Sequence, residues 1–281
     1  MSNYHLTTQQ LEQFQEDGYL ILPSLFNAEE VGRMRQEADR ILGLILNSSI
    51  ALNRISGRLD WMMGQSKLPV VRKIQPINDL SDYLTQVSND PRLLDPMRDI
   101  MQDEPVLMEE KLNYKQPLRA VVEGVPITDA RDDRFPIHND WAYYKAQNYP
   151  QEIISSAIAM DDSTTANGPL RVWPGSHRAH LEHEAMELGL QVLPGSVDFN
   201  GGIDILAPAG SVMFFHTLLV HNSRPNATDG PRRLMIYSHY PARFDLGDDA
   251  RNGPARRHEQ PYERQYCDLV QQGAYQDQFK A

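Results

Sequence analysis

The pattern of hydrophobic and polar residues predicts a short helix near the start of the chain. Thr7 and Gln10 fit the capping box that begins many helices, and Leu11 and Phe14 are apolar residues three positions apart. This pattern predicts a helix over residues 7–17. The run DGYLILP that follows predicts a turn and a short strand.

A longer amphipathic helix is predicted over residues 28–46. Asn27 and Glu30 form a second capping pair, and the apolar residues that follow repeat at the spacing of one helix face. These residues are Val31, Met34, Ala38, Ile41, Leu42 and Ile45. Residues 79–88 and 91–102 predict two further helices.

The chain changes character after about residue 105. Short runs rich in β-branched and aromatic residues alternate with turns that contain Pro, Gly and Asn. The runs are VLMEEKLNYKQP, IISSAIAMDD, LRVWPGSH, GSVMFFHTLLVH and RRLMIYSHY. Several short strands at this spacing predict an all-β sandwich or barrel. Residues 178–200 are expected to form a partly helical insertion between strands.

The expected architecture is one mainly β domain over residues 1–281, with helices packed on its outside. Its parts would be a mostly helical region with a lid at 1–104, a β core at 105–242 and a polar tail at 243–281. The expected lid is 47–69, which shows no hydrophobic period and is predicted to be a long loop.

Composition narrows the class of protein. With 41% hydrophobic and 23% charged residues, the chain is typical of a globular protein. No run approaches the ~18 apolar residues of a membrane helix, and the N-terminus lacks the pattern of a signal peptide, so a cytoplasmic location is expected. A single cysteine, Cys267, excludes an internal disulfide framework. A net charge of −11 disfavours nucleic-acid binding, which needs a concentrated basic surface.

The stretch FPIHNDWAYY holds a candidate pair of metal ligands, His138 and Asp140. Residues i and i+2 of a strand face the same side, so both side chains are expected to point into the interior of one barrel. One more imidazole would complete a set of two histidines and one carboxylate. Such a set leaves coordination positions open and is typical of non-haem Fe(II) oxygenases.

His221 is the better candidate for the third ligand. It ends the apolar strand MFFHTLLVH, and Ser223 and Arg232 follow two and eleven residues later. A hairpin between this strand and RRLMIYSHY would bring Arg232 back to the level of His221, where a guanidinium and a hydroxyl can hold a carboxylate. His216 lies five positions earlier and is expected on the opposite face of the strand.

A second group of histidines, His177, His180 and His183, is spaced by three residues. That spacing suits one face of a helix, but His177 belongs to the turn PGSH. The nearby Glu182 and Glu184 are explained equally well by a solvated helix face. A metal role for this group is therefore disfavoured.

The combined motif resembles that of the phytanoyl-CoA dioxygenase family of Fe(II)- and 2-oxoglutarate-dependent oxygenases. The matching residues are His138-x-Asp140, His221-x-Ser223 and Arg232. Other stretches are similar to the family in order and spacing: LEQFQEDGYLILPSLFNAEEV, LNYKQP, NGPLRVWPGSH and APAGSVMFFHTLLVHNSRPN. The resemblance runs from about residue 6 to 240.

This resemblance implies a double-stranded β-helix, a jelly-roll and cupin-like core, with helices packed outside. It implies that the His-Asp-His set holds iron and that Arg232 and Ser223 hold 2-oxoglutarate. Lys73, in VVRKIQPI, is similar to a lysine that relatives place near the co-substrate. The implied reaction consumes O2, converts 2-oxoglutarate to succinate and CO2, and hydroxylates the substrate.

Two positions depart from the pattern of the family. Ala157 stands where some relatives have a tryptophan, and Lys111 stands where some have a methionine. Both positions bear on the pocket walls, so the pocket need not match that of an acyl-CoA hydroxylase. Asp140 is present, whereas related halogenases replace this carboxylate by Gly or Ala to admit chloride, so halogenation is not expected.

Residues beside the metal motif and in the expected lid are candidates for substrate contacts. They are Arg54, Arg58, Trp61, Met62, Trp141 and Tyr143, with Arg119 and Asp133 in the loop before the motif. Alternate residues after Asp140 are expected to face the cavity. Arginine mixed with aromatic residues favours a small substrate with an acidic or aromatic part, such as a natural product or an amino-acid derivative.

The residues leave several outcomes open. The same iron and 2-oxoglutarate chemistry can give desaturation, cyclisation or epimerisation in place of hydroxylation. A cupin-like metal enzyme that does not use 2-oxoglutarate and a non-catalytic binding protein on the same scaffold are the alternatives. A monomer or homodimer is expected, acting on a small molecule, with no nucleic acid and no membrane as partner.

Overall fold

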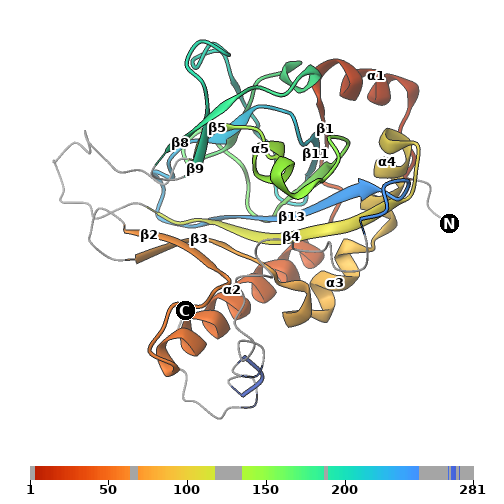
Figure 1. The fold of residues 1–281 in the computed structure, drawn as a ribbon. Helices are drawn as coiled ribbons and strands as arrows, with labels where there is room; N and C mark the ends of the chain where they lie inside the picture. Colours follow the sequence, from red (N-terminus) through yellow and green to blue (C-terminus); the bar gives the residue numbers. More distant parts are fainter. Residues whose placement is uncertain are drawn as a thin grey trace.

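The computed structural model describes residues 4–63, 69–117, 135–186 and 189–246, together with 265, 267–269 and 272. Two antiparallel sheets face each other, and helices cover the outer face of the larger sheet (Figure 1). The substrate candidates Arg119 and Asp133 lie outside the described residues, as does most of the tail after 243.

The first two helices begin where their capping patterns predict, and the third begins three residues after the predicted start at 79. The helices of the first hundred residues are α1 (Thr8–Asp17), α2 (Ala28–Ala51), α3 (Asp82–Ser88) and α4 (Pro91–Met101), with the 3-10 turn η1 (Asn78–Leu80) before α3. Both predicted capping boxes are formed, at Thr7 and at Asn27. α2 continues past the predicted end at 46. In this part of the helix the hydroxyls of Ser48 and Ser49 donate to the carbonyl oxygen of Ile45.

The larger sheet has the strand order β1-β11-β6-β13-β4-β3-β2. Its strands are β1 (Tyr19–Leu22), β2 (Leu59–Met63), β3 (Pro69–Ile74), β4 (Pro105–Lys115), β6 (Ile154–Ala159), β11 (Val212–His216) and β13 (Arg232–Pro241). The lid predicted over 47–69 is therefore wrong. Its described residues extend α2 and then form β2, whose pairing with β3 adds an edge to the sheet. A register shift between Asp60 and Trp61 interrupts the strand alternation of this hairpin, which hides a simple period in the sequence.

The smaller sheet has the strand order β10-β7-β12-β5. Its strands are β5 (Phe135–His138), β7 (Leu170–Val172), β10 (Ile203–Asp204) and β12 (His221–Ser223). The prediction of a partly helical insertion at 178–200 is wrong. After the 3-10 turn η3 (Ser176–Arg178), the chain forms a hairpin of β8 (His183–Met186) and β9 (Gly189–Val192).

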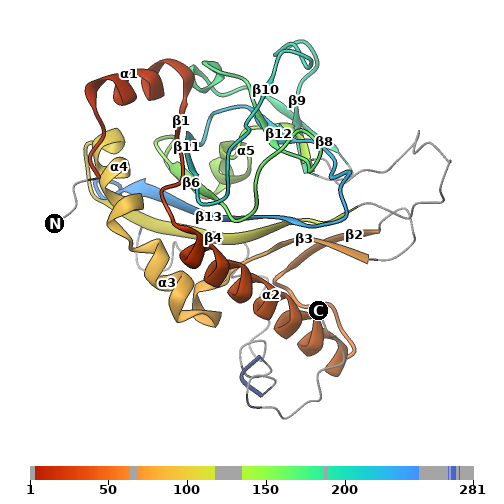
Figure 2. The same ribbon diagram turned by 180° about the vertical axis from the view of Figure 1, so that it is seen from behind.

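Strand alternation divides the core into two apolar layers. On β11, Phe214 packs toward the helices with Met34 and Met235, while Phe215 packs between the two sheets with Ile236. The helical layer lies against one face of the larger sheet and the smaller sheet lies against the other (Figure 2). The space between the sheets is therefore the place where polar side chains gather into a site. Among the described residues, no helix combines the length and apolarity needed to cross a bilayer.

Candidate active site

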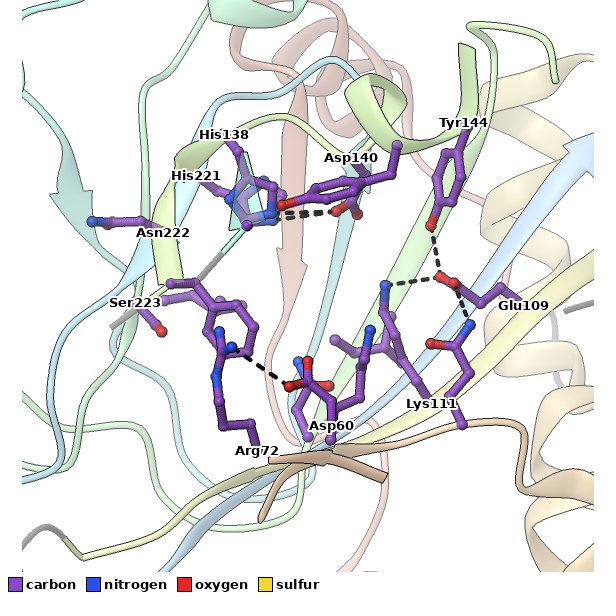
Figure 3. A pocket seen from close by; sticks show the side chains of 18 of the residues that line it. Asp60, Arg72, Glu109, Lys111, His138, Asp140, Tyr144, His221, Asn222 and Ser223 are labelled. Atoms are coloured by element: carbon purple, nitrogen blue, oxygen red, sulfur yellow. Dashed lines mark hydrogen bonds and ion pairs between the residues drawn. The ribbon is translucent and has the colours of Figure 1, made fainter. Parts of the chain in front are cut away.

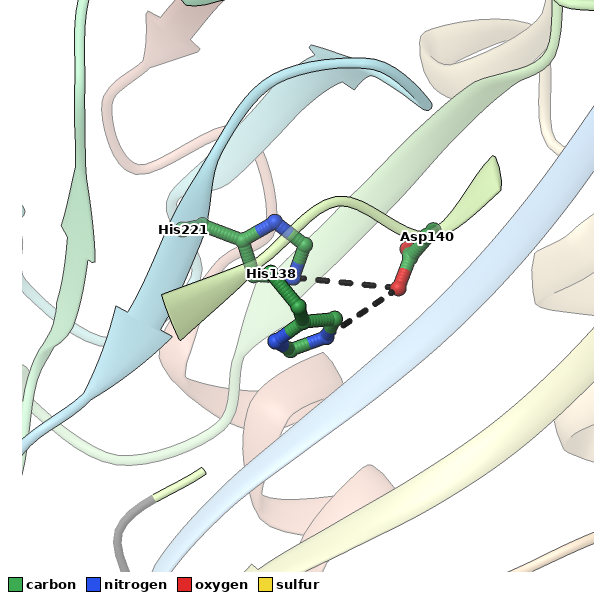
Figure 4. A group of neighbouring side chains, drawn as sticks. All are labelled: His138, Asp140 and His221. Carbon is green, nitrogen blue, oxygen red and sulfur yellow. Dashed lines mark ion pairs between the residues drawn. The ribbon is translucent and has the colours of Figure 1, made fainter. Parts of the chain in front are cut away.

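The side chains of His138, Asp140 and His221 converge between the two sheets (Figure 4). His138 ends β5 and His221 begins β12, and the two residues are direct partners in the register of these strands. The Nε2 atoms of His138 and His221 lie 3.6 Å and 3.8 Å from the same oxygen of Asp140. One ligand atom from each residue lies within 4.8 Å of the others, which is a spacing that one metal ion can bridge.

Backbone carbonyl groups orient both imidazoles. Nδ1 of His138 lies 2.7 Å from the carbonyl oxygen of Pro136, and Nδ1 of His221 lies 2.9 Å from that of Leu219. A carbonyl oxygen only accepts, so each Nδ1 carries the proton and each Nε2 presents its lone pair toward Asp140. Burial, with a smaller contribution from His138, lowers the pKa of His221 to about 4, so this ring is neutral near pH 7. Both rings are thus oriented as metal ligands.

Asp140 reaches this cluster through a helix and not through a strand. β5 ends at His138, and Asp140 is the N-cap of α5 (Trp141–Tyr144), with helical backbone angles of φ −66 and ψ −31. The predicted convergence of the two side chains is present, but strand alternation is the wrong reason for it. Four residues from this turn line the cavity at helical spacing: Asp140, Tyr143, Tyr144 and Gln147.

The helical turn also corrects the prediction for Trp141. Its indole Nε1 donates to the carbonyl oxygen of Tyr149, and its ring meets His180 edge-on at 4.7 Å, so it packs away from the cavity. Tyr143 does line the cavity, as predicted, and its ring lies edge-on to His138 at 5.6 Å. The hydroxyl of Tyr143 accepts from the backbone N–H of Leu190 on β9, which ties the β8–β9 hairpin to the rim of the site.

A cavity of about 560 Å³ opens beside the three ligands (Figure 3). One wall is a stripe of polar side chains at alternate positions of β4: Glu109, Lys111, Asn113 and Lys115. The first three line the cavity, and Lys115 donates to the hydroxyl of Ser223 at its edge. The sequence VLMEEKLNYKQP was predicted to be a strand, and its alternating polar residues were the signal that would have revealed this wall.

Lys111 and Glu109 are the centre of a buried hydrogen-bond network. Glu109 accepts from Lys111 Nζ at 2.8 Å, from the hydroxyl of Tyr144 at 2.6 Å, and from the side-chain amide of Gln75. Burial alone would raise the pKa of Glu109, but Lys111, Lys73 and the hydrogen bonds outweigh it and hold the pKa below its usual value. The wall at Lys111 is thus a buried charge pair.

Lys111 also acts on the metal ligand Asp140. Burial would raise the pKa of this carboxyl group, but Lys111 and the two histidines outweigh burial and hold the pKa far below its ordinary value. Asp140 is therefore an anion at any pH near neutrality. A permanently ionised carboxylate beside two imidazoles is a donor set that suits a divalent metal such as Fe(II).

The predicted co-substrate residues lie at different depths. Ser223 and Lys73 line the cavity, whereas Arg232 lines a smaller cavity, and Leu170 borders both. Arg232 is buried and donates through Nη2 to the carbonyl oxygen of Gly168 at 2.6 Å. The predicted hairpin pairing of its strand with that of His221 is wrong, since β13 pairs with β4 and β6 while β12 belongs to the other sheet.

Lys115 is a basic residue at this end of the site that the sequence did not reveal. It is buried, it is the direct partner of Arg232 across β4 and β13, and its Nζ lies 2.9 Å from the hydroxyl of Ser223. Lys73 lies opposite Asn113 on β4. Burial, with Lys111 adding to it, lowers the pKa of Lys73 from its ordinary value. Cations from three strands thus surround the expected place of the co-substrate.

Of the other predicted substrate residues that the structure describes, only Trp61 lines the cavity, where it is 39% exposed. Met62 alternates with Trp61 on β2 and is buried away from the cavity. Arg58 is buried, its two terminal nitrogens are 2.7 Å from the two carboxylate oxygens of Asp79, and it donates to the carbonyl oxygen of Pro76. It fastens η1 to β2 and is not available to a substrate.

Arg54 is also absent from the cavity lining. It follows the end of α2, and its Nη1 donates to the carbonyl oxygen of Ile55. The expectation that Arg54, Arg58 and Met62 contact substrate rested on the predicted lid, whereas the structure places them at a helix end and a sheet edge, outside the lining of this cavity. Residues that line the cavity without having been predicted include Asp60, Arg72, Phe135 and Asn222.

The remaining histidines lie elsewhere than the spacing predicted, since His183 belongs to β8 and not to a helix, and His216 ends β11 while His221 begins β12 in the other sheet. His180 and His183 stack at 5.4 Å, and His183 Nε2 accepts from the backbone N–H of Asn139. Nδ1 of His216 accepts from the backbone N–H of Leu218. Among the described residues, His138, Asp140 and His221 form the one group with metal-ligand spacing. The His177 trio does not form a second such group.

Two histidines and one carboxylate, set between two antiparallel sheets beside a polar cavity, define a non-haem iron oxygenase of the double-stranded β-helix type. The chain matches the family Phytanoyl-CoA dioxygenase (PhyH) over residues 14–234. It belongs to this family. The predicted family, fold class and enzyme class are thereby confirmed.

Curated relatives include ectoine dioxygenases and phytanoyl-CoA dioxygenases. Ectoine dioxygenase of Halomonas elongata is 26% identical over 250 residues, covering 83% of this chain and 69% of that protein. Peroxisomal phytanoyl-CoA dioxygenase of Homo sapiens is 24% identical over 250 residues, covering 84% of this chain and 68% of that protein. The relatives therefore include both a small-molecule hydroxylase and an acyl-CoA enzyme.

Solved structures share the fold at low sequence identity. EctD from S. alaskensis with 2-oxoglutarate and 5-hydroxyectoine has a TM-score of 0.64 and 22% identity, covering 93% of this chain and 84% of that one. The epimerase SnoN in complex with Fe3+, alpha ketoglutarate and nogalamycin RO has a TM-score of 0.61 and 18% identity, covering 83% of each chain. At these identities the likeness shows the fold.

Proposed function

We propose that this protein is an Fe(II)- and 2-oxoglutarate-dependent oxygenase that hydroxylates a small organic molecule and releases succinate and CO2. The observation that carries the proposal is the convergence of Nε2 of His138, Nε2 of His221 and a carboxylate oxygen of Asp140 at one wall of a 560 Å³ cavity. A cavity of this size suits a small molecule.

Iron(II) held by this set would supply activation of O2, and the chain's own residues would bind, orient and shield the reactants. Two imidazoles and one carboxylate leave coordination positions free for co-substrate and O2. Lys111 keeps Asp140 ionised, and the carbonyl oxygens of Pro136 and Leu219 keep the rings turned. The sheets and the β8–β9 hairpin limit access of water to the ligands.

The distal carboxylate of 2-oxoglutarate is proposed to lie at Ser223, with Lys115 and Arg232 as its cations. What supports this is the hydrogen bond of Ser223 with Lys115 and the direct pairing of Lys115 with Arg232. Lys73 on the adjacent strand is proposed to serve the same molecule. Cations at the end of a narrow site favour a dicarboxylate through charge-assisted hydrogen bonds.

Replacing Arg232 by methionine is expected to raise the KM for 2-oxoglutarate by about 30-fold or more, because truncating one partner of a buried charge pair costs roughly 2–5 kcal/mol. Ser223→Ala removes a neutral hydroxyl and is expected to raise it by about 2- to 10-fold. Succinate formation at varied 2-oxoglutarate measures both effects. Arg224→Met is the control, because Arg224 is 45% exposed and pairs with Asp204. An unchanged KM in Arg232→Met would contradict the assignment.

The experiment that tests the proposed function is turnover without a prime substrate. Purified protein with Fe(II), ascorbate, 2-oxoglutarate and O2 is expected to form succinate slowly, and a true substrate is expected to accelerate it. Profiling of small molecules by succinate release then finds the substrate. A cupin-like enzyme that does not use 2-oxoglutarate would form no succinate under any of these conditions.

Epimerisation, desaturation and cyclisation are the alternative outcomes of the same chemistry. The structural neighbour SnoN is an epimerase by its name, which supports epimerisation as one of these alternatives. The product distinguishes them by mass: hydroxylation adds one oxygen atom, desaturation and ring closure remove two hydrogen atoms, and epimerisation leaves the mass unchanged. Product analysis of the first accelerating substrate decides among these outcomes.

A monomer or homodimer in the cytoplasm belongs to the same proposal. One cysteine in 281 residues suits a reducing compartment. A net charge of −11 opposes unspecific association of copies. Light scattering that gave the mass of a trimer or a larger assembly would contradict the oligomeric part of the proposal.

A further inference from the structure

Arg72 lies at an irregular position of β3 that turns its side chain into the cavity. In the pairing of β2 with β3, Asp60 lies opposite Lys73, and the next residue, Trp61, lies opposite Val71. β3 therefore carries one extra residue, Arg72, which is the pattern of a β-bulge. Consecutive residues of a regular strand face opposite sides, yet Arg72 and Lys73 both line the cavity beside the metal ligands.

The guanidinium of Arg72 is buried and has two nitrogens without a partner among the described residues. Arg72 is 5% exposed, and neither Nε nor Nη2 makes a hydrogen bond. Its Nη1 lies 3.5 Å from an oxygen of Asp60, a long ion pair. Unmade hydrogen bonds of a buried charged group are costly, so a structure that keeps them open indicates a missing partner.

Arg233 shows how this chain satisfies an arginine that serves the fold. Its Nε and Nη2 donate to the two oxygens of Asp161, and its Nη1 donates to Asp39. Arg72 has no such carboxylate, because Asp60 meets it at one nitrogen and is itself about one-third exposed. Arg233 thus binds a carboxylate through Nε and Nη2. The same two atoms of Arg72 have no hydrogen-bond partner among the described residues.

The surroundings of Arg72 favour an anion at these two atoms. Glu109, a carboxylate on the opposite wall of the cavity, is already engaged by Lys111, Tyr144 and Gln75 and so leaves Arg72 free for another anion. The ring of Phe135 lies against the guanidinium at 4.1 Å and holds its plane. A planar, fixed guanidinium with two parallel N–H groups matches the geometry of a carboxylate.

We propose that Arg72 binds a carboxylate of the primary substrate through Nε and Nη2, and so selects carboxylic acids over neutral molecules. The assignment rests on the proposed function, in which Ser223, Lys115 and Arg232 hold the co-substrate and leave Arg72 for the substrate. Trp61 and Tyr143 line the same cavity and are 39% and 40% exposed, so they offer flat surfaces to the body of the substrate.

The test compares benzoate with benzamide, its neutral isostere, as probes for the anaerobic complex of the protein with Fe(II) and 2-oxoglutarate. Calorimetric titration of the wild type is expected to show benzoate binding about 10-fold or more tightly than benzamide, as a charge-assisted bidentate contact requires. Arg72→Gln is expected to lose this preference, and Arg72→Lys is expected to retain part of it, because lysine keeps the charge without the fork.

A second readout separates substrate binding from co-substrate binding. The visible absorption of the Fe(II)–2-oxoglutarate complex gives the affinity for 2-oxoglutarate, which is expected to stay near the wild-type value in Arg72→Gln and also shows that the variant is folded. Arg243→Gln is the matched control, because Arg243 also lies over an aromatic ring, Phe244 at 5.2 Å, but outside this cavity. It is expected to keep the preference for benzoate.

Two results would overturn the proposal. One is a wild type that binds benzoate no more tightly than benzamide. The other is an Arg72→Gln variant that loses affinity for 2-oxoglutarate while it keeps its preference for benzoate, which would make Arg72 a co-substrate residue. Failure of the proposed function gives a different result, namely no succinate from the wild type and no spectral change with 2-oxoglutarate.

Discussion

His221→Ala is expected to lower the affinity for Fe(II) by about 100-fold or more and to reduce succinate formation to background. Loss of a residue that only hydrogen-bonds to a metal ligand already lowers metal affinity about 10–100-fold. His221 would itself be one of three protein ligands, so a larger effect is expected. Its Nε2 lies 3.8 Å from Asp140. Among the described residues, no fourth side chain belongs to this cluster of ligands and could replace it. Anaerobic Fe(II) titration and a succinate assay measure the two effects.

His216→Ala is the matched control for this substitution. His216 lies five positions earlier on β11, and its Nδ1 accepts from the backbone N–H of Leu218, away from the cavity. It is expected to bind Fe(II) like the wild type. His138→Ala and Asp140→Ala are expected to fail as His221→Ala does. Undiminished Fe(II) binding in both of these variants would contradict the assignment of His138 and Asp140 as metal ligands.

Lys111→Met is expected to lower the free energy of unfolding by about 3–5 kcal/mol, the usual cost of leaving one partner of a buried ion pair uncompensated. Lys111 Nζ lies 2.8 Å from Glu109, and both side chains are nearly buried, at 11% and 10% exposed. Without the ammonium group, burial would raise the pKa of Glu109. Urea unfolding of the metal-free proteins measures the change.

The double variant Glu109→Gln with Lys111→Met is expected to recover much of the lost stability. A neutral amide at position 109 removes the uncompensated charge and can still accept from the hydroxyl of Tyr144. The two substitutions should therefore be strongly non-additive, as neighbours in one network are. Purely additive free energies would show that the pair is not coupled as the contacts indicate.

The metal ligands could be predicted because few residue types bind iron and their order along the chain is distinctive. His138-x-Asp140 and the distant His221 converge as expected. The geometry around them could not be predicted, since a helix begins where a strand was expected to continue. This one local difference sends Trp141 away from the cavity and brings Tyr144 onto Glu109.

The substrate wall was less accessible to sequence reasoning because its residues depend on partners far along the chain. Arg58 was expected to meet substrate, but Asp79, 21 residues later, takes both ends of its guanidinium. Arg72 was not expected there, because a bulge between paired strands leaves no mark in the hydrophobic pattern. Capping boxes are local, and so the helix starts at Thr7 and Asn27 were predicted correctly.

The measurement that tests the central claim most directly is the anaerobic addition of 2-oxoglutarate to the Fe(II)-loaded protein, followed by visible absorption. Chelation of the metal by 2-oxoglutarate is expected to produce a charge-transfer band that needs both components and is missing in Asp140→Ala. A wild-type protein that binds Fe(II) but shows no spectral change on addition of 2-oxoglutarate would contradict the account.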